Sequence, residues 1–477
     1  MEAKLSKELA INIKNINSIL NVEKNFDILY RVMTIGETEA CIYFVDGLNK
    51  DEILEKLMDF FYKVKKEEMP NNAHEMSVRL IPYGEVDCID NMDQLITSIL
   101  SGVPALVVDG YEKVISIDFR TYPSRGVEEP EKDKVMRGAR DGFVETLIFN
   151  TALIRRRIRN PKLTMEYASA GKSSKTDLVF CYVEDRVDQQ FLNRLKEKIK
   201  AIDVDALNMG SESLAECLHR GSWWNPFPKF KYSERPDAAA SAVLEGSIVI
   251  LIDNSPSAMI LPTTLFEITE EADDYYFPPV TGTYLRLTRF VINIIALFLT
   301  PVWLLLMNNQ TFIPKGLEFI VVKDAINIPL LAQLLILEFA VDGLKLASIN
   351  TPSMLSTPLS VVAGIVLGDF TVSSGWFNSE TMLYMAFVVI ANYSQSSYEL
   401  GYALKFLRVI LIILTGLFDF WGFGIGVVIV FVALCFNKTI SGQSYFYPII
   451  PFNGRELVRR FFRISLPAAH RENSKIH

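Results

Sequence analysis

The chain has 477 residues, half of them hydrophobic, and a formal net charge of -8 at pH 7. Such a length has room for two or three domains. The acidic balance argues against a nucleic-acid partner, because no basic surplus is available to displace counterions from phosphates. Five cysteines and four histidines are scattered singly along the chain. We therefore expect no zinc site, no disulfide framework and no cofactor.

Hydropathy divides the chain into two parts. Roughly the first 285 residues are charged and of mixed character, whereas Phe290–Phe436 is a series of apolar stretches with short polar breaks. Phe290–Met307 is free of charge over 18 residues, which is near the minimum for crossing about 30 Å of hydrocarbon. We therefore predict an α/β cytosolic region followed by an α-helical polytopic membrane domain with about six spans.

Residues 1–130 have the alternation of strands and helices of a small α/β domain. EACIYFV is strand-like, and ILEKLMDFFYKV has the apolar spacing of an amphipathic helix. PALVVDG and KVISIDFR form a predicted hairpin with Gly110 at its turn. The N-terminal stretch mixes lysines with acidic residues and has no apolar core of a secretory signal. We expect this part of the chain in the cytosol.

Residues 136–285 form a second predicted α/β domain, after the Pro- and charge-rich linker RTYPSRGVEEPEKDK. We expect helices over Asp141–Ile158 and Gln189–Ile202, with the strand DLVFCYV between them. SIVILID and AMILPTTL follow, joined by the turn-rich Asn254–Ser257. The two blocks are of similar size and could be distant copies.

Two short strings in the second block resemble functional motifs. AGKSSKT is similar to a phosphate-binding loop, but Glu166 stands where the Walker pattern needs glycine. We expect a polar turn between strands there. IRRRIRNP places four arginines at a helix end, where cations favour the helix dipole: Arg155, Arg156, Arg157 and Arg159. They are interpreted as a solvated helix end, or else as an inter-domain or inter-subunit salt-bridge patch.

Six candidate spans can be drawn within a membrane domain over residues 286–440, ahead of a cytosolic tail over 441–477. They are Phe290–Met307, Ile328–Leu346, Leu355–Val372, Thr381–Tyr398, Phe406–Leu417 and Phe420–Phe436. The second span carries charges, and the last two are separated only by a short turn around Asp419. Four spans plus re-entrant segments is the alternative.

Basic residues predict the orientation of these spans, since they concentrate on the cytosolic side. With six crossings and both termini in the cytosol, the basic residues flanking the spans share that side. They are Arg286, Arg289, Lys345, Lys405, Arg408, Lys438, Arg455, Arg459, Arg460 and Arg463. The opposite side holds Lys315 and Lys323, balanced by Glu318 and Asp324.

Carboxylates inside the apolar runs are candidates for an ion path, because such groups are costly in a bilayer. Glu338, Asp342 and Lys345 share one helix face. Asp342 and Lys345 could neutralise each other, or Glu338 could line a cation route. Asp369 lies in the third predicted span. We take Glu338, Asp342 and Asp369 as the pore candidates.

Small residues recur at every fourth position beside Asp369. Ser360, Gly364 and Gly368 would share one helix face. Small side chains let helix backbones approach closely in membranes. This face is therefore predicted to pack against a neighbouring helix, within the subunit or between subunits.

Several strings between roughly Asp141 and the C-terminus resemble the GerA-type spore germination proteins, the A-subunit family of bacterial germinant receptors. The strings are RDGFVETLIFNTALIRRRIRNP, GKSSKTDLVFCYVE, YSERPDAAASAVLEGSIVILIDNSP, TGTYLRLTR, ASINTPS and YSQSSYEL. The stretches around ASINTPS and YSQSSYEL are most similar to the SpoVAF branch. The family usually has glycine where this chain has Asn254, and asparagine also enters positive φ.

The resemblance implies a multi-pass protein of the spore inner membrane that acts in germination. A-subunits of this family are thought to form a pentameric channel for monovalent cations that works with other germination membrane proteins. The alternatives are a secondary transporter and a non-conducting scaffold. The number of subunits in the assembly would distinguish the channel from the transporter. We expect no enzyme, because no nucleophile and base, metal ligand set or phosphate loop can be assembled from the sequence.

Overall fold

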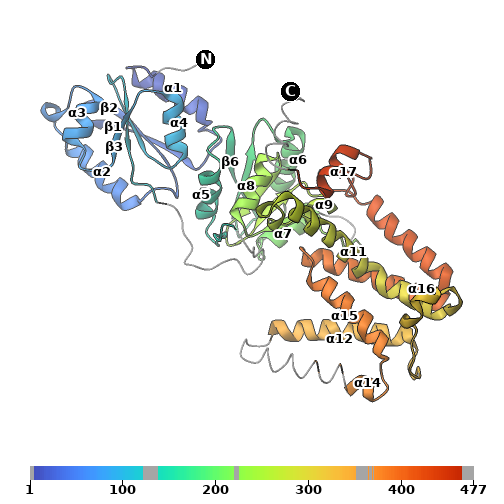
Figure 1. The fold of residues 1–477 in the computed structure, drawn as a ribbon. Coiled ribbons are helices and arrows are strands. Elements are labelled where there is room, and N and C mark those ends of the chain that lie inside the picture. The colour runs from blue at the N-terminus through green and yellow to red at the C-terminus, as the bar shows by residue number, and fades with distance from the viewer. Residues whose placement is uncertain are drawn as a thin grey trace. The chain divides into compact units, whose positions relative to one another are not determined.

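The computed structural model describes residues 5–121, 138–219, 225–350, 364, 368 and 370–464. They fall into two compact units (Figure 1). One unit comprises Met1–Arg220 and Phe230–Pro262, and the other comprises Gly221–Lys229 and Thr263–His477. Both α/β blocks belong to the first unit, so the predicted boundary between them near residue 130 stays a prediction.

The first block is a five-stranded antiparallel sheet in the order β1-β2-β4-β5-β3. The predicted strand, helix and hairpin are confirmed, with Gly110 at φ 83° in the turn between β4 and β5. The elements are α1 (Leu9–Leu20), β1 (Ile28–Ile35), β2 (Thr38–Val45), α2 (Asp51–Lys63), α3 (Ala73–Glu75), β3 (Val86–Ile89), α4 (Met92–Leu100), β4 (Ala105–Val108) and β5 (Val114–Ile117).

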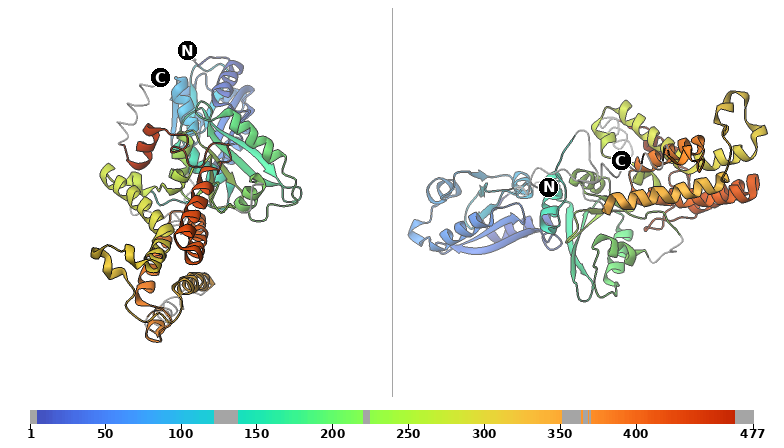
Figure 2. Two further views of the ribbon diagram at one scale, coloured as in Figure 1. Left: turned by 90° about the vertical axis from the view of Figure 1, so that its right-hand side faces the viewer. Right: turned by 90° about the horizontal axis from the view of Figure 1, so that it is seen from below.

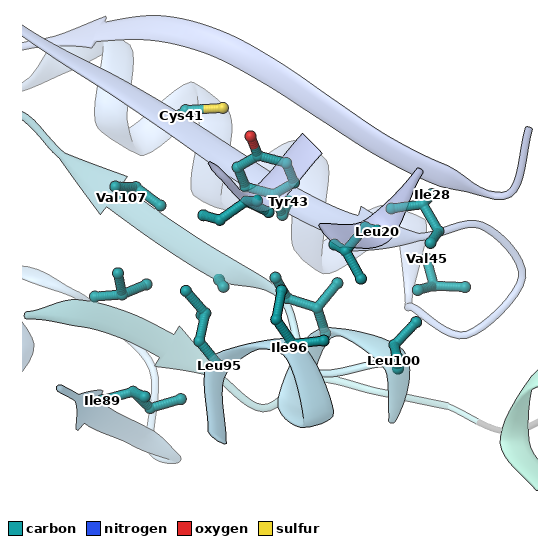
Figure 3. Close-up of a cluster of buried hydrophobic side chains, with 14 of the residues drawn as sticks. Leu20, Ile28, Cys41, Tyr43, Val45, Ile89, Leu95, Ile96, Leu100 and Val107 are labelled. Carbon is teal, nitrogen blue, oxygen red and sulfur yellow. The ribbon is translucent and has the colours of Figure 1, made fainter. Parts of the chain in front are cut away.

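Helices cover both faces of this sheet because alternate strand residues point to opposite sides. On one face Cys41 and Tyr43 of β2 pack with apolar side chains of α1 and α4, as Figure 3 shows. On the other face Ala40 and Ile42 pack in a second core with Leu57 and Phe61 of α2. The block is therefore a three-layer α/β domain.

The second block repeats this arrangement, with the order β6-β7-β9-β10-β8. Each strand takes the place of the strand five numbers lower, so the two blocks share one topology. This supports the interpretation of the blocks as distant copies. The elements are α5 (Leu147–Arg157), β6 (Leu163–Ala170), β7 (Thr176–Val183), α6 (Gln189–Lys200), α7 (Ser211–Leu218), β8 (Lys231–Ser233), α8 (Pro236–Leu244), β9 (Ile248–Ile252) and β10 (Ala258–Leu261).

Buried asparagines in the first helix of each block make the same pair of hydrogen bonds. The Asn12 side chain accepts from the Ser6 amide at 2.9 Å and donates to the Ser6 carbonyl at 2.6 Å. In the second block Asn150 bonds in the same way to Val144, at 2.8 and 2.5 Å. The chain entering each helix is therefore held by an equivalent side chain.

An aspartate after the fourth strand of each block caps the same helix. Asp109 accepts a hydrogen bond from the Leu9 amide at 2.9 Å, and Asp253 accepts one from the Leu147 amide at 3.2 Å. These are the first residues of α1 and α5, whose amides lack partners inside the helix. The first helix of the second block was predicted to start at Asp141. That start is wrong, because α5 begins at Leu147, whose amide is capped by Asp253.

The next residue in each block adopts a left-handed backbone conformation. Gly110 has φ 83° and Asn254 has φ 60°. Asparagine tolerates this region better than most residues with a side chain. The sequence argument that Asn254 can replace the family's usual glycine is confirmed.

The string AGKSSKT forms the polar turn between β6 and β7, as expected. Gly171 has φ 91° and the Ser173 hydroxyl donates to the Asp205 carboxylate. The two strands pair antiparallel from Ala170 and Thr176 outward. No helix follows the glycine here, so the backbone lacks the strand–loop–helix context of a phosphate-binding loop.

Arg155 is completely buried, so its interpretation as part of a solvated helix end is wrong. Its Nε and Nη2 donate to the two Asp27 carboxylate oxygens at 2.8 and 2.9 Å, and Nη1 donates to the Leu163 carbonyl at 3.0 Å. Asp27 immediately precedes β1, whereas Arg155 lies on α5. This bidentate pair therefore joins the two α/β blocks.

The other three arginines of the predicted patch lie differently. Arg157 pairs with Asp141, and the side chains of Arg156 and Arg159 are exposed. An inter-subunit contact through these arginines stays a prediction.

The second unit is helical and begins with α9 and α10 before the long α11. Two described helices, α11 and α16, are long and apolar enough to cross a membrane. The helices pack beside one another, as the views of Figure 2 show. The elements are α9 (Leu265–Thr269), α10 (Asp273–Tyr276), α11 (Pro279–Asn308), α12 (Leu330–Asn350), α14 (Thr371–Ser373), α15 (Ser379–Tyr393), α16 (Tyr398–Cys435) and α17 (Gly454–Phe461).

Helix α16 is a hairpin of two segments, over 398–418 and 420–435. Asp419 between them has non-helical angles, φ 54° and ψ -128°. A Cβ placed on Gly426 would lie 2.6 Å from Leu411 Cδ2, although residues that far apart in a continuous helix are separated by about 22 Å. The predicted turn at Asp419 is confirmed, but the preceding segment begins at Tyr398 instead of Phe406.

The Arg155–Asp27 pair generates a stability prediction. Replacing Arg155 by Met leaves the Asp27 carboxylate buried without its cation, so we expect a loss of about 3–5 kcal/mol in the free energy of unfolding. Thermal unfolding of the full chain in detergent measures the loss. Arg159→Met, which removes an exposed arginine of the same helix end, is the control and should change stability little. Equal losses of stability in Arg155→Met and Arg159→Met would contradict a buried Arg155–Asp27 ion pair.

Candidate functional site

The length of α11 provides a scale for depth in a bilayer. From Arg289 to Asn309 an α-helix rises about 30 Å, which is the thickness of a hydrocarbon core. The Asn309 side chain donates to Asp419 at the hairpin tip, at 2.6 Å. The end of α11 and the tip of α16 therefore lie at the same level.

Arg408 lies about midway along the first segment of α16. Counting back from Asp419, its backbone is about 16 Å from the tip. Its guanidinium also donates to the Ala296 carbonyl of α11, which is about 20 Å from the level of Asn309 by the same rise per residue. Both measures put this arginine near the middle of the roughly 30 Å length of α11 between Arg289 and Asn309.

Glu338 of α12 is the ionic partner of Arg408. Arg408 Nε donates to Glu338 Oε1 at 2.6 Å and Nη2 donates to Oε2 at 2.9 Å. Both side chains are buried, Arg408 completely. Glu338 is therefore compensated by a base, since a planar guanidinium meets both of its oxygens, and its predicted place on a cation route stays a prediction.

Lys405 connects this pair to Asp342, one turn further along α12. Its Nζ lies 2.5 Å from an Asp342 oxygen, 3.4 Å from Glu338 Oε2 and 3.0 Å from the Glu338 carbonyl. The Asp342 side chain is 39% exposed, against 5% for Glu338. We name these four residues, Glu338, Asp342, Lys405 and Arg408, the charge cluster.

Two expectations about this region are corrected. Lys345 does not neutralise Asp342, because its ammonium lies over the rings of Tyr398 and Tyr402, at 5.1 and 4.2 Å. Lys405 and Arg408 do not precede the helix segment, as predicted, but lie within it and pair with acids of α12. The sequence offered one signal for the true pairing: two acids four residues apart and two bases three residues apart, each set within an apolar run.

The remaining predicted site residues are only partly within the described residues. Asp369 and Ser360 lie outside them, and so does most of the predicted third span. A Cβ on Gly364 or Gly368 would meet no atom within 4 Å. Their predicted role in helix packing is not tested by these contacts and stays a prediction.

A second group of charges surrounds the start of α11. Buried Asp274 accepts from Arg286 Nε at 3.2 Å and from Arg289 Nη1 at 2.9 Å. Arg460 of α17 pairs with Glu267 at 2.6 Å. This network ties α9, α10 and α17 to the end of α11 that lies away from Asn309.

Aromatic side chains gather at the opposite end of the helices. Phe312 packs edge-on against Phe420 beside the hairpin tip, with centroids 5.4 Å apart. Trp421 is 84% exposed and Trp376 is 58% exposed. Exposed tryptophans are typical of membrane–water interfaces. The two ends of the bundle thus differ: buried ion pairs of arginines lie at one, and exposed tryptophans lie at the other.

Within the residues that the structure describes, no group of three or more His, Cys, Asp or Glu side chains is arranged to hold a metal ion. The charge cluster contains both signs in equal number. Its described contacts are therefore those of an ion-pair network.

The charge cluster generates a second prediction. Arg408→Met should lower the thermal unfolding temperature of the detergent-purified protein by several degrees, because it leaves Glu338 buried without its bidentate partner. Lys405→Met should have a smaller effect, since Asp342 is partly exposed and Glu338 keeps Arg408. A larger effect of the lysine variant would show that Lys405 neutralises Glu338.

Comparisons with known proteins identify the family of this chain. The family model for the Bacillus/Clostridium GerA spore germination protein matches residues 14–475. Stage V sporulation protein AF of Bacillus subtilis is 35% identical over 95% of this chain and 92% of its own length. Spore germination protein KA of the same organism is 26% identical over 96% of this chain and 85% of its own.

One solved structure is also similar. The crystal structure of the N-terminal domain of the A subunit of the Bacillus megaterium spore germinant receptor GerK3 is 25% identical, with a TM-score of 0.43. The match covers 55% of this chain and 97% of that domain. On the family model and the similarity to Stage V sporulation protein AF, the chain belongs to the GerA spore germination protein family.

Proposed function

We propose that this chain is a subunit of an oligomeric cation channel of the spore inner membrane, which triggers or amplifies the response to germinants. Membership of the GerA family and the similarity to a stage V sporulation protein support a role in spores. The proposed partners are further copies of the chain, other germination membrane proteins and monovalent cations.

The observation that carries the proposal is the exposure of Asp342. Its carboxylate is 39% exposed in a single chain, although its position on α12 is about 12 Å from the end of that helix. Lys405 pairs with this carboxylate at 2.5 Å, but an ionised group whose other side faces lipid at such depth is still costly. A second subunit or a water-filled path would remove that cost, and an oligomeric channel supplies both.

The two chemically different ends of the bundle support the proposed orientation. The arginines near the start of α11 fit the cytosolic side, and the exposed tryptophans fit the opposite interface. Helices α11, α12, α15 and the two segments of α16 supply five crossings, and the predicted span over Leu355–Val372 would be the sixth. Both termini would then be cytosolic.

Stoichiometry separates this function from its alternatives. Five copies around an axis, the predicted pentamer, would support the channel. A monomer or dimer would support a transporter, and an oligomer without conductance would support a scaffold. The native mass of the detergent-purified protein, followed by flux in liposomes, distinguishes the three.

A labelling experiment tests the orientation. Asn378 immediately precedes α15 and accepts a hydrogen bond at 2.7 Å from Gln333, near the start of α12, so the proposal puts residue 378 on the side opposite the cytosol. A cysteine introduced there should react with an impermeant reagent only from that side. Since Asn378 is itself buried, Ser374→Cys, at an exposed position four residues earlier, is the matched variant. Reaction from the cytosolic side in both variants would contradict six crossings.

The ion path is tested by removing single carboxylates. Asp342→Asn should lower cation flux in liposomes or shift its selectivity, because Asp342 is the exposed member of the charge cluster. Asp369→Asn should do the same if the third predicted span borders the pore. Glu338→Gln should act mainly on stability, since Arg408 already neutralises it. Wild-type flux and selectivity in both aspartate variants would require another helix to line the path.

A further inference from the structure

A short segment of the chain crosses from one unit into the other and back. Gly221–Lys229 belongs to the helical unit, although the residues on both sides of it belong to the α/β unit. The chain therefore passes between the units three times, at residues 220–221, 229–230 and 262–263. We call its described part, residues 225–229, the strap.

The strap is anchored in the helical unit by one aromatic side chain. Phe227 is buried and its ring lies 5.7 Å from that of Tyr445, which is also buried. Both belong to an apolar cluster that includes Leu411 and Val430 from the two segments of α16. The strap thus packs against the same core that closes the α16 hairpin.

Polar contacts fix the strap to the chain just after α16. Lys229 Nζ donates to the Lys438 carbonyl at 2.6 Å and to the Asn437 side chain, and Asn225 donates to Asn437 at 2.9 Å. The same ammonium lies 5.2 Å from the centre of the Tyr445 ring. We call Lys229, Asn437 and Tyr445 the clamp.

Burying the polar groups of the clamp makes the free energy of folding less favourable. Lys229 is 5% exposed, and among the described residues no carboxylate forms an ion pair with it. Burial lowers the pKa of Lys229 to about 8. The Tyr445 hydroxyl and the Asn437 amide nitrogen are buried without hydrogen-bond partners in the described residues. Apolar side chains would stabilise this site more, so the clamp is a poor stabiliser but a specific connection.

The position of the clamp suggests what it connects. The peptide from Lys229 to Lys231, where β8 begins, spans at most about 7 Å. On the other side Asn437 lies close to the end of α16 at Cys435. A displacement of β8 by more than the slack in this peptide must therefore pull on the end of the hairpin or break the clamp.

We propose that the clamp is a coupling element that transmits structural changes in the second α/β sheet to the α16 hairpin. The inference rests on the proposed function only in that the hairpin is taken as part of the channel. Lys229 acts as a positioning residue, because it holds the strap and does not face an ion path.

A perturbation inside the sheet tests the coupling. Val249 of β9 is fully buried and pairs with Ile260, which pairs with Lys231 on its other side. Val249→Ala loosens the packing of the sheet at the position that is aligned, through Ile260, with Lys231 of β8. Hydrogen exchange of the amides of residues 437–445 is then measured in the full-length detergent-purified protein. The measurement does not use flux, so it remains informative if the chain conducts no ions.

We expect Val249→Ala to raise the exchange rates of residues 437–445 about 5-fold or more, the lower range of allosteric coupling. In the Lys229→Met background the same substitution should have no further effect. Lys438→Met removes an exposed lysine one residue from Asn437 and is the control, so it should leave the 5-fold response intact. Lys229→Gln replaces Lys229→Met if the latter fails to fold. Equal responses with and without Lys229 would overturn the proposal, and so would no response in the otherwise unchanged chain.

Discussion

The bidentate pair between Arg408 and Glu338 is the constraint on which the helical unit depends. Both charges are buried inside the helix bundle, where an unpaired ion is very costly. The pair sets the register of α12 against α16, and the third guanidinium nitrogen contacts a carbonyl of α11. Three helices are thus fixed by one side chain, because any slip between them would separate these charges.

The α16 hairpin extends this constraint to both ends of the bundle. At the tip, Asp419 accepts from Asn309. Along the seam, Gly426 allows Leu411 to approach its backbone, so the second segment returns beside the first. Its end delivers Asn437 to the strap that leads back into the α/β unit. The hairpin therefore connects the charge cluster with the strap.

Local patterns in the sequence predicted the local features of the fold. The hairpin at Gly110 and the turn at AGKSSKT follow from strand periodicity and turn residues, which act over a few positions. The helix start at Leu147 and the burial of Arg155 were not predicted, because Asp253 and Asp27 are more than a hundred residues away in sequence. Arg408 was misplaced for the same reason: its partner lies on another helix, and proximity to the end of an apolar run suggested a flanking role.

Exchanging the two charges tests the central claim most directly. In Glu338→Arg or Arg408→Glu alone, two like charges meet inside the helix bundle, so the thermal unfolding temperature of the purified protein should fall strongly. In the double variant the pair is restored with reversed polarity, although the contact to the Ala296 carbonyl is lost. The account predicts that the double variant recovers more than half of the loss caused by the worse single variant. A double variant no more stable than that single variant would contradict a direct Arg408–Glu338 pair.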